Sequence, residues 1–337
     1  MTLSSRATLL ATVLCLPAAL SAAELNLYTS REPKLVEPLL EAFTAETGIA
    51  VNTVFLKDGL AERVAAEGGS SPADVLMAVD VGNMADFVEK GLTQAITSEA
   101  VLAAVPSTLR DPQNQWVALS MRARVVYAAK ELDLDAITYE DLADPKWAGK
   151  ICIRSGQHPY NTGLFAAYLA HHGAEATEAW LSGIKANLAR TPGGGDRDGA
   201  KDILGGICDI AVANSYYVGL MRTNEKDPEQ KAWGAAIKVL LPTFENGGTH
   251  VNISGAALAK HAPNKAEAVK LLEFLTSDAA QKIYAEANFE YPVNAGAAVS
   301  PVVASFGPLA IDPLPLTEVV ANRKAASALV ERVGFDN

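Results

Sequence analysis

The sequence is poor in cysteine and in basic residues, and both shortages narrow the classes of protein it can belong to. Three of its 337 residues are cysteines, and 28 Lys and Arg stand against 39 Asp and Glu, for a formal net charge of −11. An acidic chain repels the phosphates of nucleic acids and of anionic membranes, so we expect neither as a partner. After the first residues no apolar run is long enough to insert into a membrane, and there is no repeat.

Residues 1–23 have the composition of a secretory signal peptide. Arg6 supplies a basic start, an apolar stretch runs from 7 to 20, and Ser21-Ala22-Ala23 offers the small residues of a cleavage site. Cys15 follows a leucine, where a lipoprotein site would have a small residue, so lipidation is not expected. Cleavage would leave 27 basic and 39 acidic residues, a formal charge of −12, in an exported and soluble chain.

The two remaining cysteines, Cys152 and Cys208, are an even pair in an oxidising compartment. They belong to strand-like runs at 150–154 and 208–213, so a disulfide requires these two strands to be neighbours. The alternative is two buried free thiols. We expect the disulfide, because exported thiols tend to be oxidised.

The mature chain alternates between strand-like and helix-like segments. Its first part predicts strands at 25–28, 49–55 and 73–79, separated by amphipathic helices that end at glycines. This βαβαβ order predicts a parallel, doubly wound sheet with right-handed crossovers.

A second α/β unit follows a long strand-like stretch at 116–129. Its expected strands are 150–154, 188–191 and 209–213, with helices at 162–171 and 198–204; strands at 239–242 and 250–258 lead back, and helices follow at 266–275, 279–287 and 317–333. Two α/β units joined by extended crossover strands predict two lobes with a cleft between them and a hinge that opens and closes it.

The most informative stretch is 208–217, in which a buried strand-like run ends at two adjacent tyrosines. Neighbouring side chains on a strand point to opposite faces, but Tyr216 and Tyr217 lie just past the run, where the backbone can turn. Both hydroxyls could then converge at the carboxyl end of the strand, where open α/β sheets bind ligands. The alternative is an ordinary pair of amphipathic surface tyrosines.

Several motifs along the chain resemble those of extracytoplasmic solute-binding proteins. They are Leu25 to Arg31, Pro38 to Phe43 with Glu46 to Ile49, Ser71-Pro72-Ala73-Asp74-Val75, and Tyr139 to Trp147. Tyr160-Asn161 and Ala213-Asn214-Ser215-Tyr216-Tyr217 resemble, more specifically, the periplasmic ferric-iron-binding branch, and the resemblance spans essentially the whole mature chain.

This resemblance implies an α/β, two-lobed periplasmic binding protein of a type II-like fold. Each lobe would be a doubly wound sheet, and extended crossover strands would form the hinge. The first lobe is expected to comprise residues 24–122 and about 246–290, and the second 123–245 and about 291–337. The implied protein is a periplasmic monomer that delivers iron to an inner-membrane ABC permease and its ATPase.

The family's tyrosine ligands to Fe³⁺ correspond by resemblance to Tyr160, Tyr216 and Tyr217. The chemistry of the donors agrees, because a small, highly charged, hard cation prefers anionic oxygen to thiolate or imidazole. A trivalent cation also favours the ionised phenol that binds it, and three phenolates would balance its charge.

The first lobe departs from part of the family. Glu32-Pro33 stands where some members have a histidine or a tyrosine, and Val79 where others have a glutamate. Members without such ligands complete the metal shell with a carbonate-like anion, which the resemblance suggests here as well.

Five residues are candidates for holding that anion or supporting the metal site. The guanidinium groups that suit a planar oxyanion belong to Arg31, Arg122 and Arg124. The two weaker candidates are Glu32 and Tyr28. Glu32 could instead begin a helix, Tyr28 could be a core residue, and the two strand arginines could form a solvent face.

Other functions are less well supported by the sequence. It contains no nucleophile elbow, no His-Glu-x-x-His motif and no plausible carboxylate pair, so we do not expect an enzyme. The predicted signal peptide argues against an effector-sensing regulator. A binding protein for a small organic or inorganic anion, built on the same fold, remains the alternative.

Overall fold

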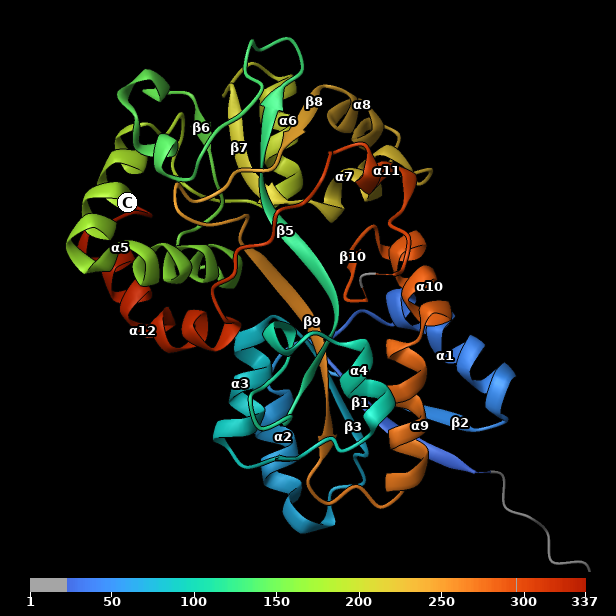
Figure 1. Ribbon diagram of the computed structural model, residues 1–337. Coiled ribbons are helices and arrows are strands. Elements are labelled where there is room, and N and C mark those ends of the chain that lie inside the picture. The colour runs from blue at the N-terminus through green and yellow to red at the C-terminus, as the bar shows by residue number, and fades with distance from the viewer. Residues whose placement is uncertain (1–22, 295) are drawn as a thin grey trace, which may run out of the picture.

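The computed structural model describes residues 23–294 and 296–337, and it has two lobes joined by two long strands (Figure 1). The predicted signal peptide lies outside the described residues, apart from Ala23. Within the described ranges no helix is long and apolar enough to cross a membrane.

The first lobe is an α/β sheet covered by helices. β1 (Glu24–Thr29) pairs in parallel with β2 (Ala50–Phe55) and with β3 (Val75–Val79), and β3 pairs antiparallel with β9 (Val251–Ala259). The α-helices and the short further strand of this lobe are α1 (Pro33–Thr47), α2 (Leu60–Glu67), α3 (Val81–Glu89), β4 (Thr93–Gln94), α4 (Glu99–Ala104), α9 (Lys265–Thr276) and α10 (Asp278–Asn288).

The helix α1 shows how the sequence pattern produces these elements. Its buried side chains recur at helical spacing, at Val36, Leu39, Leu40 and Phe43, so one face packs on the sheet. The helix ends at Gly48, whose φ of 71° is the left-handed conformation that a glycine adopts without strain.

The second lobe is built around β7 (Ile210–Asn214). This strand pairs in parallel with β6 (Ile151–Cys152) and antiparallel with β5 (Val117–Ala129), which also pairs with β8 (Ile237–Leu240) and β10 (Tyr291–Pro292). Its helices are α5 (Pro159–Ala186), α6 (Asp196–Leu204), α7 (Tyr216–Arg222), α8 (Glu229–Ala235), α11 (Pro301–Ala304) and α12 (Leu316–Arg332).

The strands β5 and β9 connect the two lobes (Figure 1). The first half of β5 pairs with β9, and from Arg124 onwards β5 pairs with β7 and β8 instead. Because side chains alternate along a strand, Ser120, Arg122 and Arg124 lie on one face of β5 and Met121 and Ala123 on the other. This alternation puts the two arginines and Met121 on opposite sides of β5.

The two-lobed α/β fold predicted from the sequence is confirmed, with two corrections. The sheet is mixed rather than parallel throughout, because β9 and β5 run antiparallel to their neighbours as the chain crosses between lobes. The strand predicted at 188–191 is wrong: only Leu188 pairs, in an isolated bridge with Ile151, before the chain turns towards α6.

Cys152 on β6 and Cys208 just before β7 are joined in a disulfide, with their Cα atoms 5.9 Å apart. The pairing of β6 with β7 meets the condition that the two cysteines belong to neighbouring strands. The bond closes a loop of 56 residues, which contains Tyr160 and the helices α5 and α6.

Candidate functional site

Tyr216 and Tyr217 form the first turn of α7, directly after β7. The strand ends at Asn214, Ser215 already has helical backbone angles, and the helix begins at Tyr216. The turn brings the two rings together, with centroids 4.1 Å apart and planes tilted by 32°. Both tyrosines are half-buried. They are therefore not a pair of fully exposed surface residues, and the structure places them at the carboxyl end of the strand.

Tyr160 lies in the first turn of the other helix at this site, α5. The side chain of His158 caps that helix by accepting a hydrogen bond from the Tyr160 backbone N–H, and the two rings meet edge-on at 4.6 Å. Two guanidinium groups flank the Tyr160 ring: Arg154 lies 5.2 Å from the ring centroid and Arg122 lies 5.6 Å from it.

Tyr160 is close enough to Tyr216 and Tyr217 to affect the ionisation of both. Burial raises the pKa of Tyr216 well above its ordinary value, and the neighbouring phenols of Tyr160 and Tyr217 raise it further. Burial, with a contribution from Tyr160, raises the pKa of Tyr217 to about 12. The guanidinium groups oppose this, since Arg122 favours ionised Tyr216 and Arg154 favours ionised Tyr217. Without a bound cation the two adjacent tyrosines are therefore neutral at physiological pH.

Arg122 and Arg124 are both buried, with exposed fractions of 1% and 2%, so the idea that they form a solvent face is wrong. Arg122 donates to Ser254 at 3.1 Å, while its Nε and Nη2 have no hydrogen-bond partner among the described residues. Arg124 instead uses both of its Nη atoms on Asp196, Asn214, Asn161 and the Val212 carbonyl.

Arg31 lies on the first-lobe side of the same region. It follows β1, is 4% exposed, and donates to Ser254 at 2.6 Å and to the Glu290 carboxylate at 3.1 Å. The Glu290 carboxylate also accepts a hydrogen bond from Ser120 and lies 3.9 Å from Arg122. The charge of Arg31 is thus largely matched by a buried carboxylate. Arg31 keeps one buried nitrogen, Nε, without a partner among the described residues, whereas Arg122 keeps two.

Tyr28 and Glu32, the other two candidates, are not brought to the tyrosine cluster by any contact in the described structure. Tyr28 is buried on β1, and its hydroxyl donates to Glu67 at the end of α2, 3.1 Å away. Glu32 precedes α1 with 61% of its side chain exposed, and it pairs with Lys34. The structure gives Tyr28 the environment of a core residue and Glu32 the position that begins a helix.

Sequence reasoning missed several charged residues at this site. Arg154 follows β6 and lies over Tyr160, while Arg197, in the first turn of α6, lies 5.1 Å from the centroid of the Tyr217 ring. Asp196, 3% exposed, binds both Arg124 and Arg154. The rule that ligands gather at the carboxyl ends of strands could have identified Arg154, because it is the last residue of the strand predicted at 150–154. Nothing in the sequence singled out Asp196.

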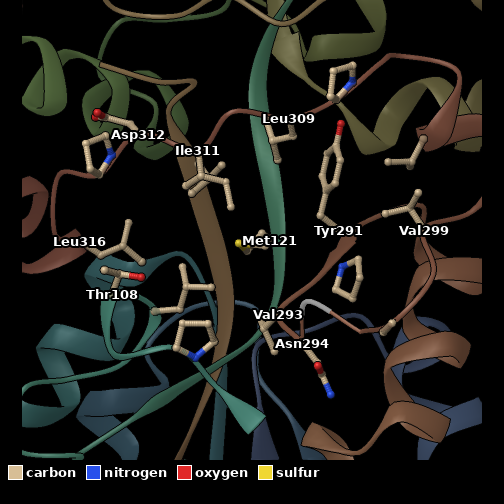
Figure 2. A pocket seen from close by; sticks show the side chains of 18 of the residues that line it. Thr108, Met121, Tyr291, Val293, Asn294, Val299, Leu309, Ile311, Asp312 and Leu316 are labelled. Atoms are coloured by element: carbon tan, nitrogen blue, oxygen red, sulfur yellow. The ribbon is translucent and has the colours of Figure 1, made fainter. Parts of the chain in front are cut away.

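The other face of β5 lines a separate apolar cavity of about 520 Å³. Figure 2 shows Met121 at its back, Tyr291 and Val299 on one side, and Leu316 and Thr108 on the other. No residue of the tyrosine cluster lines it. The cavity and the cluster therefore lie on opposite sides of β5.

The chain as a whole resembles known proteins. Residues 28–282 match the family model described as bacterial extracellular solute-binding protein. The chain belongs to this family.

Solved structures of ferric-binding proteins extend this result. The Bordetella ferric binding protein has 63% sequence identity and a TM-score of 0.90, with 93% of this chain and 100% of that chain covered. A Trichodesmium protein solved in complex with iron and citrate ligands has 40% identity and a TM-score of 0.89, covering 93% and 100%. Iron uptake protein A1 of Synechocystis sp. is 41% identical over 315 residues, 93% of this chain and 87% of that protein. The family resemblance inferred from the sequence is confirmed.

Proposed function

We propose that this protein captures Fe³⁺ in the cleft between its lobes, with the phenolates of Tyr160, Tyr216 and Tyr217 as ligands. The observation that carries the proposal is the convergence of three phenols from two distant segments. Tyr160 lies in the first turn of α5 and the other two in the first turn of α7, yet Tyr160 affects the pKa of both. The ferric-binding proteins and the iron uptake protein with which the chain aligns over more than nine-tenths of its length support the same cargo.

The donor set suits a hard trivalent cation. Phenolate oxygen is hard and anionic, and three phenolates would neutralise the charge of Fe³⁺. The described residues contain no group of three or more His, Cys, Asp or Glu side chains that could hold a metal. Because the neutral phenols must lose protons to bind, metal capture releases protons and weakens as the pH falls.

Three phenolates leave room in the metal shell for a further ligand, and a carbonate-like anion bound beside Arg122 would supply it. Nε and Nη2 of Arg122 are buried without a hydrogen-bond partner among the described residues. Burying such a donor costs free energy of folding unless an acceptor forms a hydrogen bond with it. A guanidinium fork fits a planar oxyanion in two-point contact. Arg31 and Arg124 support the anion less directly, since their charges face Glu290 and Asp196.

The protein is proposed to act in the periplasm, as a monomer and not as an enzyme, and to pass iron to an inner-membrane ABC permease with its ATPase. Its membership of a solute-binding family and the predicted signal peptide support this role. The lobes are proposed to comprise 24–122 with about 246–290, and 123–245 with about 291–337. β5 and β9 run between them as the hinge.

Titration of the iron-free protein with ferric nitrilotriacetate tests the proposal. Ferric phenolate complexes absorb visible light, so a coloured band should grow and saturate at one iron per protein, with metal analysis giving the same ratio. A colourless protein that retains no iron would overturn the proposal. If that protein instead bound an oxyanion, it would be the small-anion carrier that the same fold could support.

A further inference from the structure

A buried ion pair lies beneath the tyrosine cluster and contacts both segments that carry the tyrosines. Arg124, on β5, donates from Nη1 to Oδ2 of Asp196 at 2.6 Å, and the exposed fractions of these residues are 2% and 3%. Asp196 is the first residue of α6, 72 positions further along the chain. Neither side chain is one of the proposed metal ligands.

The first connection leads to Tyr160. Nη2 of Arg124 donates to the side-chain oxygen of Asn161 at 2.5 Å, and Asn161 is adjacent to Tyr160 in the first turn of α5. The amide of Asn161 then donates to the backbone carbonyls of Arg154 and Ser155, which fixes the chain entering the helix. Asn161 is fully buried, so these bonds are not exchanged for bonds to water.

The second connection leads to Tyr216 and Tyr217. Nη1 of Arg124 donates to the side-chain oxygen of Asn214 at 3.1 Å, and Oδ2 of Asp196 accepts the Asn214 backbone N–H at 2.7 Å. Asn214 ends β7 two residues before Tyr216. The ion pair therefore holds both the side chain and the backbone N–H of Asn214, the residue from which the chain turns into the two tyrosines.

A third connection leads to a guanidinium that flanks the cluster. Oδ1 of Asp196 accepts from Nη1 of Arg154 at 3.3 Å, and Arg154 lies over the Tyr160 ring. A single carboxylate thus joins the arginine beside Tyr160 to the arginine that bonds Asn161 and Asn214.

We propose that Arg124 and Asp196 are positioning residues that set the spacing between Tyr160 and the Tyr216–Tyr217 pair. This inference rests on the proposed function, because it assigns the pair a role toward the same metal site. A planar guanidinium has donors in a rigid fork and can bridge two segments at fixed separation, whereas the single ammonium of lysine cannot. Outer residues that orient metal ligands commonly contribute 10- to 100-fold to metal affinity, so an effect of about that size is expected.

The test replaces the fork while keeping the charge. Arg124→Lys should fold, because the Asp196 carboxylate still faces a cation. It should bind Fe³⁺ at least about tenfold more weakly in competition with a chelator and show a shifted visible band. In the iron-free protein the near-ultraviolet circular dichroism of the tyrosines should change as well, since their relative placement changes.

A matched control comes from the same lobe. Arg190 binds Asp202 of α6 at 2.7 Å and contacts the carbonyls of Thr191 and Gly193, with no bond to a tyrosine-bearing segment. Arg190→Lys should leave the band, the affinity and the dichroism unchanged. Asn161→Ala, which cuts only the connection to Tyr160 and leaves the ion pair intact, provides a milder variant if Arg124→Lys does not fold. It should shift the band in the same way.

The outcomes separate this inference from the proposed function. A wild-type protein without a visible band would defeat the proposed function itself. If wild type is coloured but Arg124→Lys and Asn161→Ala have unchanged bands and affinities, the positioning role is wrong, even if both variants melt at a lower temperature. Lower melting temperatures with unchanged bands and affinities would mean that the Arg124–Asp196 ion pair only stabilises the lobe.

Discussion

The guanidinium of Arg323 on α12 is paired with the carboxylate of Asp80, the residue that caps α3. α12 packs along α5 of the second lobe, and α3 packs on β3 and β9 of the first, so this pair joins the two lobes. Asn252 on β9 also donates to Asp80. Gly82 makes the contact possible, because a Cβ at that position would lie 1.4 Å from Nη1 of Arg323.

Loss of this ion pair should let the cleft open more often. In Arg323→Gln the Asp80 carboxylate loses its cationic partner, and a charged hydrogen bond contributes about 1.5 kcal/mol or more. We expect the ratio of wider to narrower conformers of the iron-free protein to rise about tenfold, seen as a larger radius of gyration in X-ray scattering. Arg332→Gln is the control, because Arg332 lies on the same helix but pairs with Glu178 of its own lobe. Equal radii for wild type and Arg323→Gln would contradict the expectation.

Removal of one phenol oxygen should weaken iron binding without harming the fold. Tyr216→Phe and Tyr217→Phe keep the two adjacent rings but delete a charged donor, so the visible band should shift or vanish and the affinity fall by orders of magnitude. The melting temperature of the iron-free protein should change little. Tyr168→Phe is the matched control, since Tyr168 stacks on Trp180 within the same lobe, away from the cluster. Unaltered colour and affinity in both site variants would exclude these tyrosines as ligands.

The sequence predicted the parts of this fold that depend on local pattern. Helical spacing of Val36, Leu39, Leu40 and Phe43 identified α1, because burial of one helix face imposes a helical period on the sequence. The apolar run before Asn214 identified β7, because a strand buried on both faces is apolar without interruption. Strand pairing has no such local signature. The antiparallel course of β5 and β9 therefore became visible only in the structure.

The position of the tyrosines could be predicted from local sequence, whereas the carboxylates that bind the neighbouring arginines could not. Tyr216 and Tyr217 follow a recognisable strand, so their place at its carboxyl end could be inferred. Asp196 binds Arg124 across 72 positions, and Glu290 binds Arg31 across 259. Nothing near these carboxylates in the sequence indicates such distant partners. Arg124, expected beside an anion, contacts Asp196 and two asparagines instead, and its part in anion binding stays a prediction.

The disulfide between Cys152 and Cys208 should stabilise the second lobe. Closing a loop of 56 residues contributes about 4 kcal/mol in chain-entropy models. The double variant Cys152→Ser/Cys208→Ser should lose a free energy of unfolding of about that size in urea titrations. Mass analysis of the unreduced mature protein should find no alkylatable thiol, and two reactive thiols in the denatured protein would refute the bond.

A buried histidine should make the protein less stable in mild acid. Burial, with the nearby charges of Arg124 and Arg122, lowers the pKa of His250 to about 3. The unfolded chain takes up a proton near pH 6.5 while the folded chain does not, so stability falls as the pH drops from 6.5 towards 3. Between pH 7 and pH 5 this histidine accounts for a loss of about 2 kcal/mol.

Urea unfolding at the two pH values checks this contribution. His250→Gln should lose about 2 kcal/mol less than wild type over the same interval, because glutamine does not titrate. The exposed His261 provides the control, and His261→Gln should behave as wild type does. A His250→Gln protein with the full wild-type pH dependence would show that the histidine is not held neutral.

The manner of iron release should reveal whether an anion completes the metal shell. Acid favours release, because the raised pKa values of Tyr216 and Tyr217 mean that protons compete strongly for the phenolates. A carbonate-like anion protonates before metal-bound phenolate does, whereas arginine does not titrate in this range. Iron should therefore leave wild type in two stages, with a colour change preceding the bleaching.

Arg122→Gln should remove the first of these stages and make iron binding insensitive to added bicarbonate, because Arg122 has two unpartnered nitrogens, Nε and Nη2, where Arg31 and Arg124 each have one. Arg31→Gln should weaken the bicarbonate dependence less, since the charge of Arg31 already faces Glu290. Stopped-flow acidification of the iron-loaded proteins, with and without bicarbonate, measures the stages of iron release and their dependence on bicarbonate. Arg190→Gln serves as the control. If neither variant alters the bicarbonate dependence, no anion is held by these arginines. The exposed carboxylate of Glu32, brought in by closure of the lobes, would then be the better candidate for the missing ligand.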